Sequence, residues 1–398
     1  MDTLRTYTGR KLNIEGGTTE ISTNLKVCAE LDANGEDLYI AYLAPDNIEY
    51  VYWFRKCMFN MLYSFYRVGY RTSSNTIPDT YGINTEVGIT WLNRTYSDNI
   101  GPLSTNSGGW TGGNHSWQND NKTKTAQTDS YIIEADGYAL MPLDKVYCKK
   151  VTISVINTIF DPSVAPEEGD ESLSTPFSTE SVVYVVEQSS INVSVRQKLA
   201  GITNNWLKTY YGMQSMFDGE TAILTPNGQY LDWEASTSGY SHFNKADYPR
   251  FNRFVEKNAK GYQSSYVQPY KLGNHDKTAF SIFERGSNKS YHVLVNSTTS
   301  LIPVGGSIVW CGVYTFFKTP IIDNEYVFAY SGIVNGNDTI FIWVKKAYEG
   351  TIPMPINYQM RLITNIEKDN AITTDNTMID AEGVSISASA AGSWIFHL

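Results

Sequence analysis

Apolar and polar residues alternate along many short runs of this sequence. In "KKVTISVINTI", residues 149–159, Val and Ile alternate with Thr, Ser and Asn, and "INVSVRQ", residues 191–197, repeats the pattern. A period of two is typical of a strand with one buried face. The apolar run "SVVYVVE" comes just before the second of these, and residues 188–190 between them predict a hairpin turn.

Further strands are predicted over most of the C-terminal half. They include "YHVLVNS", "GGSIVWCGVYTFF", "EYVFAYSGIV" and "DTIFIWVKKAY", and the final "GVSISASAAGSWIFHL" reads as two short strands around residues 390–392. Helical periodicity is rare, and the best helix candidate is "YPRFNRFVEKNAKG", residues 248–261. The aromatic run "EYVYWFRKCMFNMLYSFYRVGY", residues 49–70, predicts two strands, and the acidic residues 161–181 predict an exposed loop.

These elements predict an all-β protein with mostly antiparallel pairing. A change of composition near residues 312–325 suggests the domain boundary. We expect a large antiparallel β-sandwich over residues 1–315, followed by a smaller C-terminal β domain over residues 316–398.

The charge and composition of the chain indicate which classes of binding partner to expect. The 398 residues carry a net charge of −10, and only short basic clusters occur, so we expect neither nucleic acid nor an anionic membrane surface as a partner. Charged residues make up 18% of the chain, while 28 Tyr residues suit both strands and surfaces that bind sugars or proteins.

The cysteines and the N-terminal residues indicate the cell compartment in which the chain is made. The four cysteines, Cys28, Cys57, Cys148 and Cys311, have no zinc-site spacing and are expected to be buried free thiols, which fits synthesis in a reducing cytoplasm. The N-terminus has no apolar signal-peptide core, and no run approaches the ~20 apolar residues of a membrane span.

The segment "GGWTGGNHSWQND", residues 108–120, is the first candidate for a functional site. A saccharide site needs a flat aromatic face together with convergent amides, carboxylates or Arg. The loop supplies these types in Trp110, Asn114, His115, Trp117 and Asp120. The alternative is that its glycines only form a tight irregular turn while both Trp side chains fill the core.

A second candidate lies in "NGQYLDWEASTSGYSHFN". It offers Tyr230, Asp232, Trp233 and Glu234, whose types also suit carbohydrate, although a strand end followed by a solvated turn would look the same.

Enzymatic motifs are not found. His115 could act as a general base, but no nucleophile elbow, zinc-binding HExxH or phosphate-binding loop occurs. We therefore assign no catalytic residue, metal ligand or cofactor. A hydrolytic carboxylate pair stays open, because spacing in sequence does not fix spacing in space.

Several segments together resemble a known family. "YSDNIGPL", "GGWTGGNHSW", "DSYIIEADG", "SVVYVVEQSSINVSVRQ" and "YYGMQSMF", within residues 85–315, are similar to the tail-tip receptor-binding proteins of siphophages of Gram-positive bacteria, of the Lactococcus and Listeria phage type.

The resemblance implies a homotrimer in the virion, made in the host cytoplasm. An N-terminal shoulder would dock to other tail or baseplate proteins, and a C-terminal head would bind a host cell-wall saccharide, such as one containing N-acetylglucosamine or glycerol phosphate. No collagen-like or heptad segment separates the halves, so a trimer would form through faces of the β domains. The alternatives are a β-sandwich polysaccharide depolymerase, either a hydrolase or a lyase, and a structural baseplate component.

Overall fold

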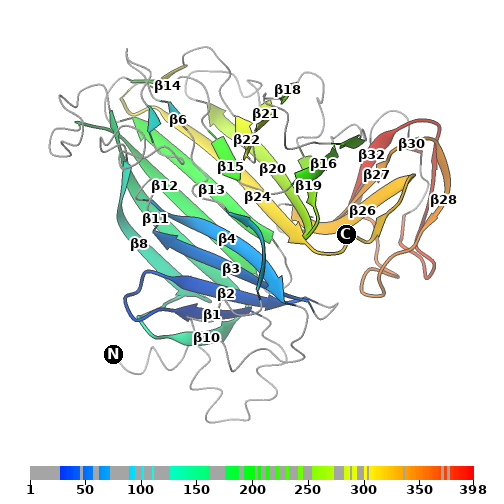
Figure 1. Ribbon diagram of the computed structural model, residues 1–398, viewed down its shortest axis with the longest axis horizontal. Helices are drawn as coiled ribbons and strands as arrows, with labels where there is room; N and C mark the ends of the chain where they lie inside the picture. Colours follow the sequence, from blue (N-terminus) through cyan, green and yellow to red (C-terminus); the bar gives the residue numbers. More distant parts are fainter. Residues whose placement is uncertain are drawn as a thin grey trace, which may run out of the picture. The chain divides into compact units, whose positions relative to one another are not determined.

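The computed structural model shows a protein built from β-strands (Figure 1). It describes residues 27–44, 48–56, 62–71, 89–94, 101–102, 110–111, 126–161, 175–187, 192–201, 205–207, 212–215, 220–224, 230–232, 241–244, 253–272, 282–286, 289–293, 300–302, 304–334, 337–368, 372–373 and 377–398. No helix occurs among these residues, and the strand pairs described below are antiparallel, which confirms the predicted all-β class.

The chain forms two compact units. Unit 1 comprises Met1–Asp218, Ser238–Asn244 and Val267–Gly312, and unit 2 comprises Gly219–Thr237, Lys245–Tyr266 and Val313–Leu398. The predicted domains, residues 1–315 and 316–398, stay a prediction.

Unit 1 contains a six-stranded sheet of order β10-β1-β2-β3-β4-β5. Its strands are β1 (Val27–Leu31), β2 (Leu38–Leu43), β3 (Glu49–Lys56), β4 (Tyr63–Arg71), β5 (Thr90–Arg94) and β10 (Lys145–Cys148). β3 and β4 confirm the prediction of two strands, rather than a helix, for the aromatic run.

A second layer of unit 1 has the order β13-β12-β11-β8-β9. Its strands are β8 (Ala126–Ala135), β9 (Tyr138–Ala139), β11 (Lys150–Asp161), β12 (Thr175–Glu187) and β13 (Asn192–Gly201). β12 and β13 form the expected hairpin, with Val186 opposite Val193. The expected loop over residues 161–181 is wrong at both ends, because β11 ends at Asp161 and β12 begins at Thr175. The residues between them, 162–174, lie outside the described part of the chain.

The core of this sandwich follows from the alternation seen in the sequence. Val151, Ile153 and Val155 are fully buried on β11, whereas Thr152 and Ser154 between them are partly exposed. From the six-stranded sheet, the buried Phe54 meets Tyr184 edge-on, with the ring centroids 5.4 Å apart. Burial of each such side chain is worth about 1.5–3 kcal/mol.

Shorter sheets complete unit 1. They are the pair β14 (Asn205–Leu207) and β23 (Ser300–Ile302), the pair β6 (Gly101–Pro102) and β7 (Trp110–Thr111), and a sheet of order β15-β22-β21-β18, from β15 (Gly212–Ser215), β22 (Lys289–Val293), β21 (Ile282–Gly286) and β18 (Ser241–Asn244).

Unit 2 contains two further sheets around a separate core. The five-stranded sheet, of order β25-β26-β27-β32-β29, consists of β25 (Ile322–Asp323), β26 (Val327–Val334), β27 (Asn337–Val344), β32 (Gly392–His397) and β29 (Asn365–Lys368). The three-stranded sheet, of order β28-β31-β30, consists of β28 (Tyr348–Ile352), β31 (Val384–Ala388) and β30 (Ile372–Thr373). The predicted strand pair at the C-terminus is present as β31 and β32, but each belongs to a different sheet; Ile386 and Trp394 enter the same core.

The strands β17-β16-β19-β20 also contribute to unit 2. They are β16 (Glu220–Leu224), β17 (Tyr230–Asp232), β19 (Arg253–Asn258) and β20 (Gly261–Leu272); β20 and β24 (Ser307–Phe317) each have residues in both units.

The helix predicted over residues 248–261 is wrong. Residues 253–258 form β19, which pairs with β20 through a tight turn where Asn258 Oδ1 accepts hydrogen bonds from the backbone N–H groups of Lys260 and Gly261. Phe254, Val255 and Glu256 are all buried, so the segment has no solvated helical face. Ladder pairing on both sides of the strand, to β16 and β20, outweighs its weak helical period.

An ionic cluster links β25 to β19 and β20 within unit 2. Asp323 accepts hydrogen bonds from Lys257 Nζ at 2.9 Å, Lys345 Nζ at 2.7 Å and the Tyr262 hydroxyl at 2.7 Å. Burial alone would raise the pKa of Asp323, but the hydrogen bonds from Lys345, Lys257 and Tyr262 together hold it below the usual value. Burial and the hydrogen bond to this carboxylate raise the pKa of Tyr262 to about 12.

The expectation for the cysteines holds in part. Cys28 and Cys148 are buried thiols, Cys311 is a partly exposed thiol, and none of the three forms a disulfide; Cys57 lies outside the described residues. None of the described segments is a helix long and apolar enough to span a membrane.

Candidate functional site

Most of the residues predicted to bind saccharide lie outside the described part of the chain. These are Asn114, His115, Trp117, Asp120, Trp233 and Glu234, and the predictions for them stand untested.

The other three predicted residues are placed by their backbone alone. Trp110 lies in β7, opposite Pro102 of β6. Tyr230 and Asp232 lie in β17, opposite Leu224 and Ala222 of β16. The first belongs to unit 1 and the other two to unit 2.

The described side chains offer a different candidate on the six-stranded sheet of unit 1, which we call the aromatic–arginine cluster. It lies on the face turned away from β8, β11 and β12, and consists of Asp37, Tyr39, Trp53, Arg55, Tyr66, Arg67 and Trp91.

Strand register brings the cluster together. Tyr39, Trp53 and Arg67 are successive cross-strand partners on β2, β3 and β4. The register of β3 and β4 shifts between Trp53 and Phe54, which leaves Tyr66 as an extra residue. Such a β-bulge turns two consecutive side chains toward one face, so Tyr66 and Arg67 both reach Trp53.

A glycine permits Trp91 to join the cluster. Gly69 is the cross-strand partner of Trp91, beside a second register shift. A Cβ at Gly69 would lie 3.0 Å from Trp91 Cε3, 2.8 Å from the Thr90 carbonyl oxygen and 2.5 Å from Ile89 Cγ2. Only glycine therefore allows β5 and the Trp91 ring to approach this closely.

Trp53 is held at the centre by several contacts. Its indole N–H donates a 3.0 Å hydrogen bond to Asp37 Oδ1, and its ring stacks on Tyr39 with the centroids 5.2 Å apart. The Tyr66 ring meets it edge-on at 4.8 Å, and Trp91 lies at 5.9 Å. Trp53 itself is 6% exposed, whereas Tyr39, Tyr66 and Trp91 are only partly buried, so the outer rings retain accessible surface.

The loop that carries Asp37 is fixed to the sandwich core. Asp32 Oδ1 accepts the backbone N–H groups of Glu36 and Asp37, and Gly35 takes a positive φ of 77° that few other residues adopt. The Tyr131 hydroxyl donates a hydrogen bond to the Gly35 carbonyl at 2.8 Å. The pKa of Tyr131 is raised, mainly by burial and to a lesser extent by the nearby carboxylates of this loop. The position of Asp37 is thus set before any ligand binds.

The two arginines differ in their partners. Arg55 lies 5.1 Å from the Trp53 ring, and its Nε is 3.4 Å from Asp37 Oδ1. The Arg67 guanidinium lies 5.1–5.8 Å from the rings of Tyr66, Trp91 and Trp53, distances typical of cation–π contacts, but it has no carboxylate partner among the described residues. Its Nε–H is buried, so the terminal N–H groups are the donors that would form hydrogen bonds with oxygen atoms of a ligand.

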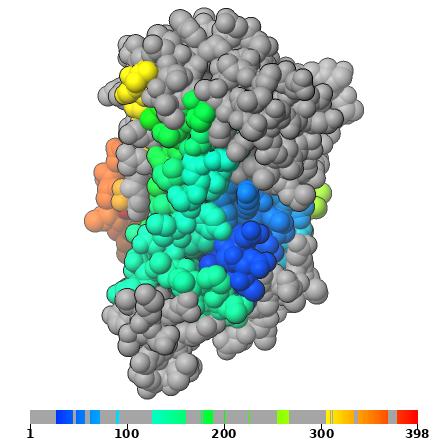
Figure 2. Space-filling view, turned by 90° about the vertical axis from the view of Figure 1, so that its left-hand side faces the viewer, coloured from blue at the N-terminus to red at the C-terminus, as the bar shows by residue number. Residues whose placement is uncertain are grey.

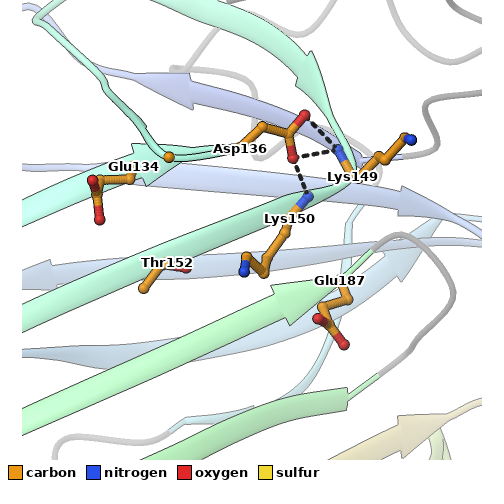
Figure 3. Close-up of a pocket in the computed structure, with 7 residues that line it drawn as sticks. Glu134, Asp136, Lys149, Lys150, Thr152 and Glu187 are labelled. Carbon is orange, nitrogen blue, oxygen red and sulfur yellow. Dashed lines mark hydrogen bonds between the residues drawn. The ribbon is translucent and has the colours of Figure 1, made fainter. Parts of the chain in front are cut away.

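A shallow hollow of about 760 Å³ occurs elsewhere on unit 1 (Figure 3). It is lined by Glu134, Asp136, Gly137, Lys149, Lys150, Thr152 and Glu187. Asp136 is committed to the backbone, because its carboxylate accepts the N–H groups of Lys149 and Lys150 at 2.9–3.2 Å. The described residues that line the hollow include no aromatic ring, so they do not supply the flat apolar face that a saccharide requires.

The described residues contain no group of three or more His, Cys, Asp or Glu side chains arranged to hold a metal ion. The aromatic–arginine cluster can instead stack planar or ring-shaped ligands and hydrogen-bond their oxygens, which is binding chemistry.

Sequence reasoning missed most of this cluster. Its available signal was the density of aromatic and Arg residues in "EYVYWFRK" and "SFYRVGY", two runs that were predicted as strands. Which of their side chains share a face depends on the bulge at Tyr66, and the sequence does not show that bulge.

No protein-family model matches the sequence, and no curated protein matches it. Among solved structures, the galactosidase domain of an α-galactosidase–sucrose kinase is similar with a TM-score of 0.34 and 12% identity, over 74% of this chain and 41% of that one. An α-galactosidase from Geobacillus stearothermophilus gives 0.37 and 8%, over 74% and 41%. A galactose 1-epimerase from Lactobacillus acidophilus gives 0.32 and 9%, over 74% and 99%.

This chain spans about 41% of the length of the two galactosidases. At these TM-scores and identities, the likenesses carry no argument about activity. The case for a function therefore rests on the side chains of this protein.

Proposed function

We propose that this protein binds a saccharide without cleaving it, and that it does so as the receptor-binding protein of a phage tail. In this role it would recognise a cell-wall saccharide of a Gram-positive host. The observation that carries the saccharide part is the aromatic–arginine cluster. The cluster lies within residues 37–91, so the proposed site is in the N-terminal part of the chain and differs from the C-terminal head that the resemblance implies. The phage part rests on the resemblance of residues 85–315 to siphophage receptor-binding proteins, which also implies the virion location, the baseplate partners and a homotrimer.

The cluster has the features that a saccharide site needs. Partly exposed aromatic rings provide flat faces for the C–H side of a sugar ring, and Arg67 and Asp37 provide a donor and an acceptor for hydroxyl groups. Because Trp53 and Asp37 are fixed by the sheet and the loop, binding orders few side chains and loses little entropy.

Such a site would be weak by itself. One stacking contact and a few hydrogen bonds correspond to a Kd between millimolar and micromolar, roughly −4 to −8 kcal/mol. Several linked copies raise the effective affinity by about 10²–10⁴, which suits an adhesin displayed in many copies.

The direct test is calorimetric titration of the full chain with wall polysaccharides purified from a panel of Lactococcus and Listeria strains. Trp91→Ala and Arg67→Ala are each expected to weaken binding at least tenfold, a loss of about 1.4 kcal/mol. Tyr326→Ala is a matched control, because Tyr326 is a partly exposed ring with Lys346 Nζ 4.1 Å from its centroid in unit 2.

The control should bind like the wild type. If Trp91→Ala and Arg67→Ala both keep their folded circular dichroism and wild-type affinity, the cluster is not the site. If the wild type binds no polysaccharide and no intact cells, the receptor-binding role is wrong.

The two alternatives have separate readouts. A depolymerase would release new reducing ends or unsaturated uronates from the same polysaccharides, and we expect neither product. A structural baseplate component would bind another tail protein tightly and intact host cells not at all.

A further inference from the structure

The second layer of unit 1 has a face that points away from the six-stranded sheet. The residues that alternate with the buried Val151, Ile153 and Val155 on β11 are Thr152, Ser154 and Ile156. Thr152 and Ser154 are partly exposed, and Ile156 is more exposed than either. Figure 2 shows atoms of residues 126–161 and 175–187 at the molecular surface. We call this the outer face of β8, β11 and β12.

Aliphatic side chains occupy the middle of this face. Ile132 on β8 is 57% exposed and Ile156 on β11 is 43% exposed. Ile132 is opposite Ser154, and Ser130 is opposite Ile156, so the two isoleucines are diagonal neighbours on adjacent strands. Val183 of β12 continues the row from Ser154 and is also partly exposed. A contiguous group of exposed aliphatic side chains indicates an interaction surface, whereas single scattered residues do not.

Charged side chains of both signs lie at one end of the face, where they line the hollow of Figure 3. Lys150 is the cross-strand partner of Glu187, and Glu134 lies one strand away, opposite Thr152. None of these three side chains has an ion pair among the described residues. A patch that carries both signs can pair with a copy of itself, because each charge finds its opposite on the partner.

The size of the face also suits self-association. β11 has 12 residues, about 40 Å at a rise of ~3.4 Å per residue, and three strands about 4.8 Å apart span roughly 14 Å. The face therefore covers roughly 600 Å². Two such faces would bury about 1,200 Å² in total, at the lower end of the range of stable interfaces.

From these observations we infer that the outer face of β8, β11 and β12 is the surface through which two copies of this chain associate. The net charge of −10 makes copies of the chain repel one another and so opposes nonspecific contacts between them. This face instead carries aliphatic side chains together with charges of both signs. The inference does not depend on saccharide binding. A face that pairs with its own copy joins two chains, so this contact is separate from the contacts of the homotrimer that the resemblance implies.

Sedimentation velocity of the full chain tests this inference. The wild type is expected to sediment at tens of micromolar as a species heavier than one 44.7 kDa chain. The double variant Ile132→Lys/Ile156→Lys should raise the dissociation constant at least tenfold, and Lys150→Glu should raise it severalfold. Leu362→Lys is the matched control, because Leu362 is 69% exposed in unit 2 and should leave association unchanged.

A second double variant, Ile132→Thr/Ile156→Thr, keeps strand propensity and covers the case in which the lysines prevent folding. The inference is overturned if the wild type is a monomer at 100 µM. It is equally overturned if the folded double variants associate like the wild type, or if Leu362→Lys disrupts association as much as they do.

Discussion

Substitution of Gly69 by alanine tests how the aromatic–arginine cluster is assembled. The new Cβ would lie 2.5 Å from Ile89 Cγ2, 2.8 Å from the Thr90 carbonyl oxygen and 3.0 Å from Trp91 Cε3. A side-chain end can rotate away, but Thr90 belongs to the ladder between β4 and β5, where it is the cross-strand partner of Tyr70. Ordinary contact begins near 3.4 Å, so β5 must move outward by more than half an ångström.

The expected cost can be worked out from this geometry. Overpacking costs about 1–3 kcal/mol, and the clash with a backbone atom places Gly69→Ala in the upper part of that range. Alanine recovers about 0.4–1 kcal/mol through the reduced entropy of the unfolded chain. The net loss is therefore about 1–2.5 kcal/mol, and Trp91 moves away from Arg67.

Urea unfolding followed by Trp fluorescence measures the loss. With an m-value of about 3 kcal/mol/M, the midpoint should fall by about 0.3–0.8 M, and saccharide affinity should fall with it. Gly332→Ala is the matched control, because its nearest neighbour is a side-chain atom of Phe341 at 3.1 Å rather than a backbone atom, and the next atoms are 3.6 Å away, so the clash is smaller. A Gly69→Ala midpoint equal to that of the wild type, with unchanged affinity, would refute this account of the cluster.

Three further predictions concern single residues. The pKa of Asp323 is lowered in the folded protein, so the stabilisation by its carboxylate is complete above the unfolded value of 3.8 and is lost as the pH falls through the folded pKa. Asp323→Asn leaves Lys257 and Lys345 without their carboxylate partner. This variant should remove the acid dependence of stability and cost about 1–3 kcal/mol, as measured in thermal melts of unit 2. Asp37→Ala should cost about 1–3 kcal/mol and weaken saccharide binding, because it removes the acceptor that fixes the central indole; unchanged titration curves would contradict this. Gly383→Ala should destabilise unit 2 by about 3 kcal/mol or more, since φ is +131° and a Cβ would lie 2.0 Å from a backbone oxygen; a variant that melts like the wild type would contradict the geometry of this turn.

Prediction from the sequence succeeded where one strand face is buried and the other is solvated. β11 is the clearest case, since its Val and Ile positions are buried and its Thr and Ser positions are not. Prediction failed over residues 248–261, because the consecutive residues Phe254, Val255 and Glu256 of β19 are all buried and the two-residue period disappears there. Glu256 is fully buried there, and its carboxylate accepts a hydrogen bond from the Gln263 side-chain amide, an environment that no local sequence pattern reveals.

The candidate site was harder to predict than the fold. The residues chosen from the sequence were gathered from single loops, because residue types close in sequence are the only groups that a sequence shows. The aromatic–arginine cluster draws on β2, β3, β4 and β5, so its members are brought together by pairing. A shift of one residue in any of these pairs would turn a ring to the opposite face.

The sequence alone determined the all-β class, the β12–β13 hairpin and the two strands of the aromatic run, because period-2 patterning and turn residues act locally. Only the tertiary structure decided that Tyr66 and Arg67 share the Trp53 face, that Gly69 admits Trp91, and that β31 and β32 enter different sheets. The physical reason is that bulges, register and strand order are fixed by packing between distant segments, whose energies are comparable to the local preferences they override.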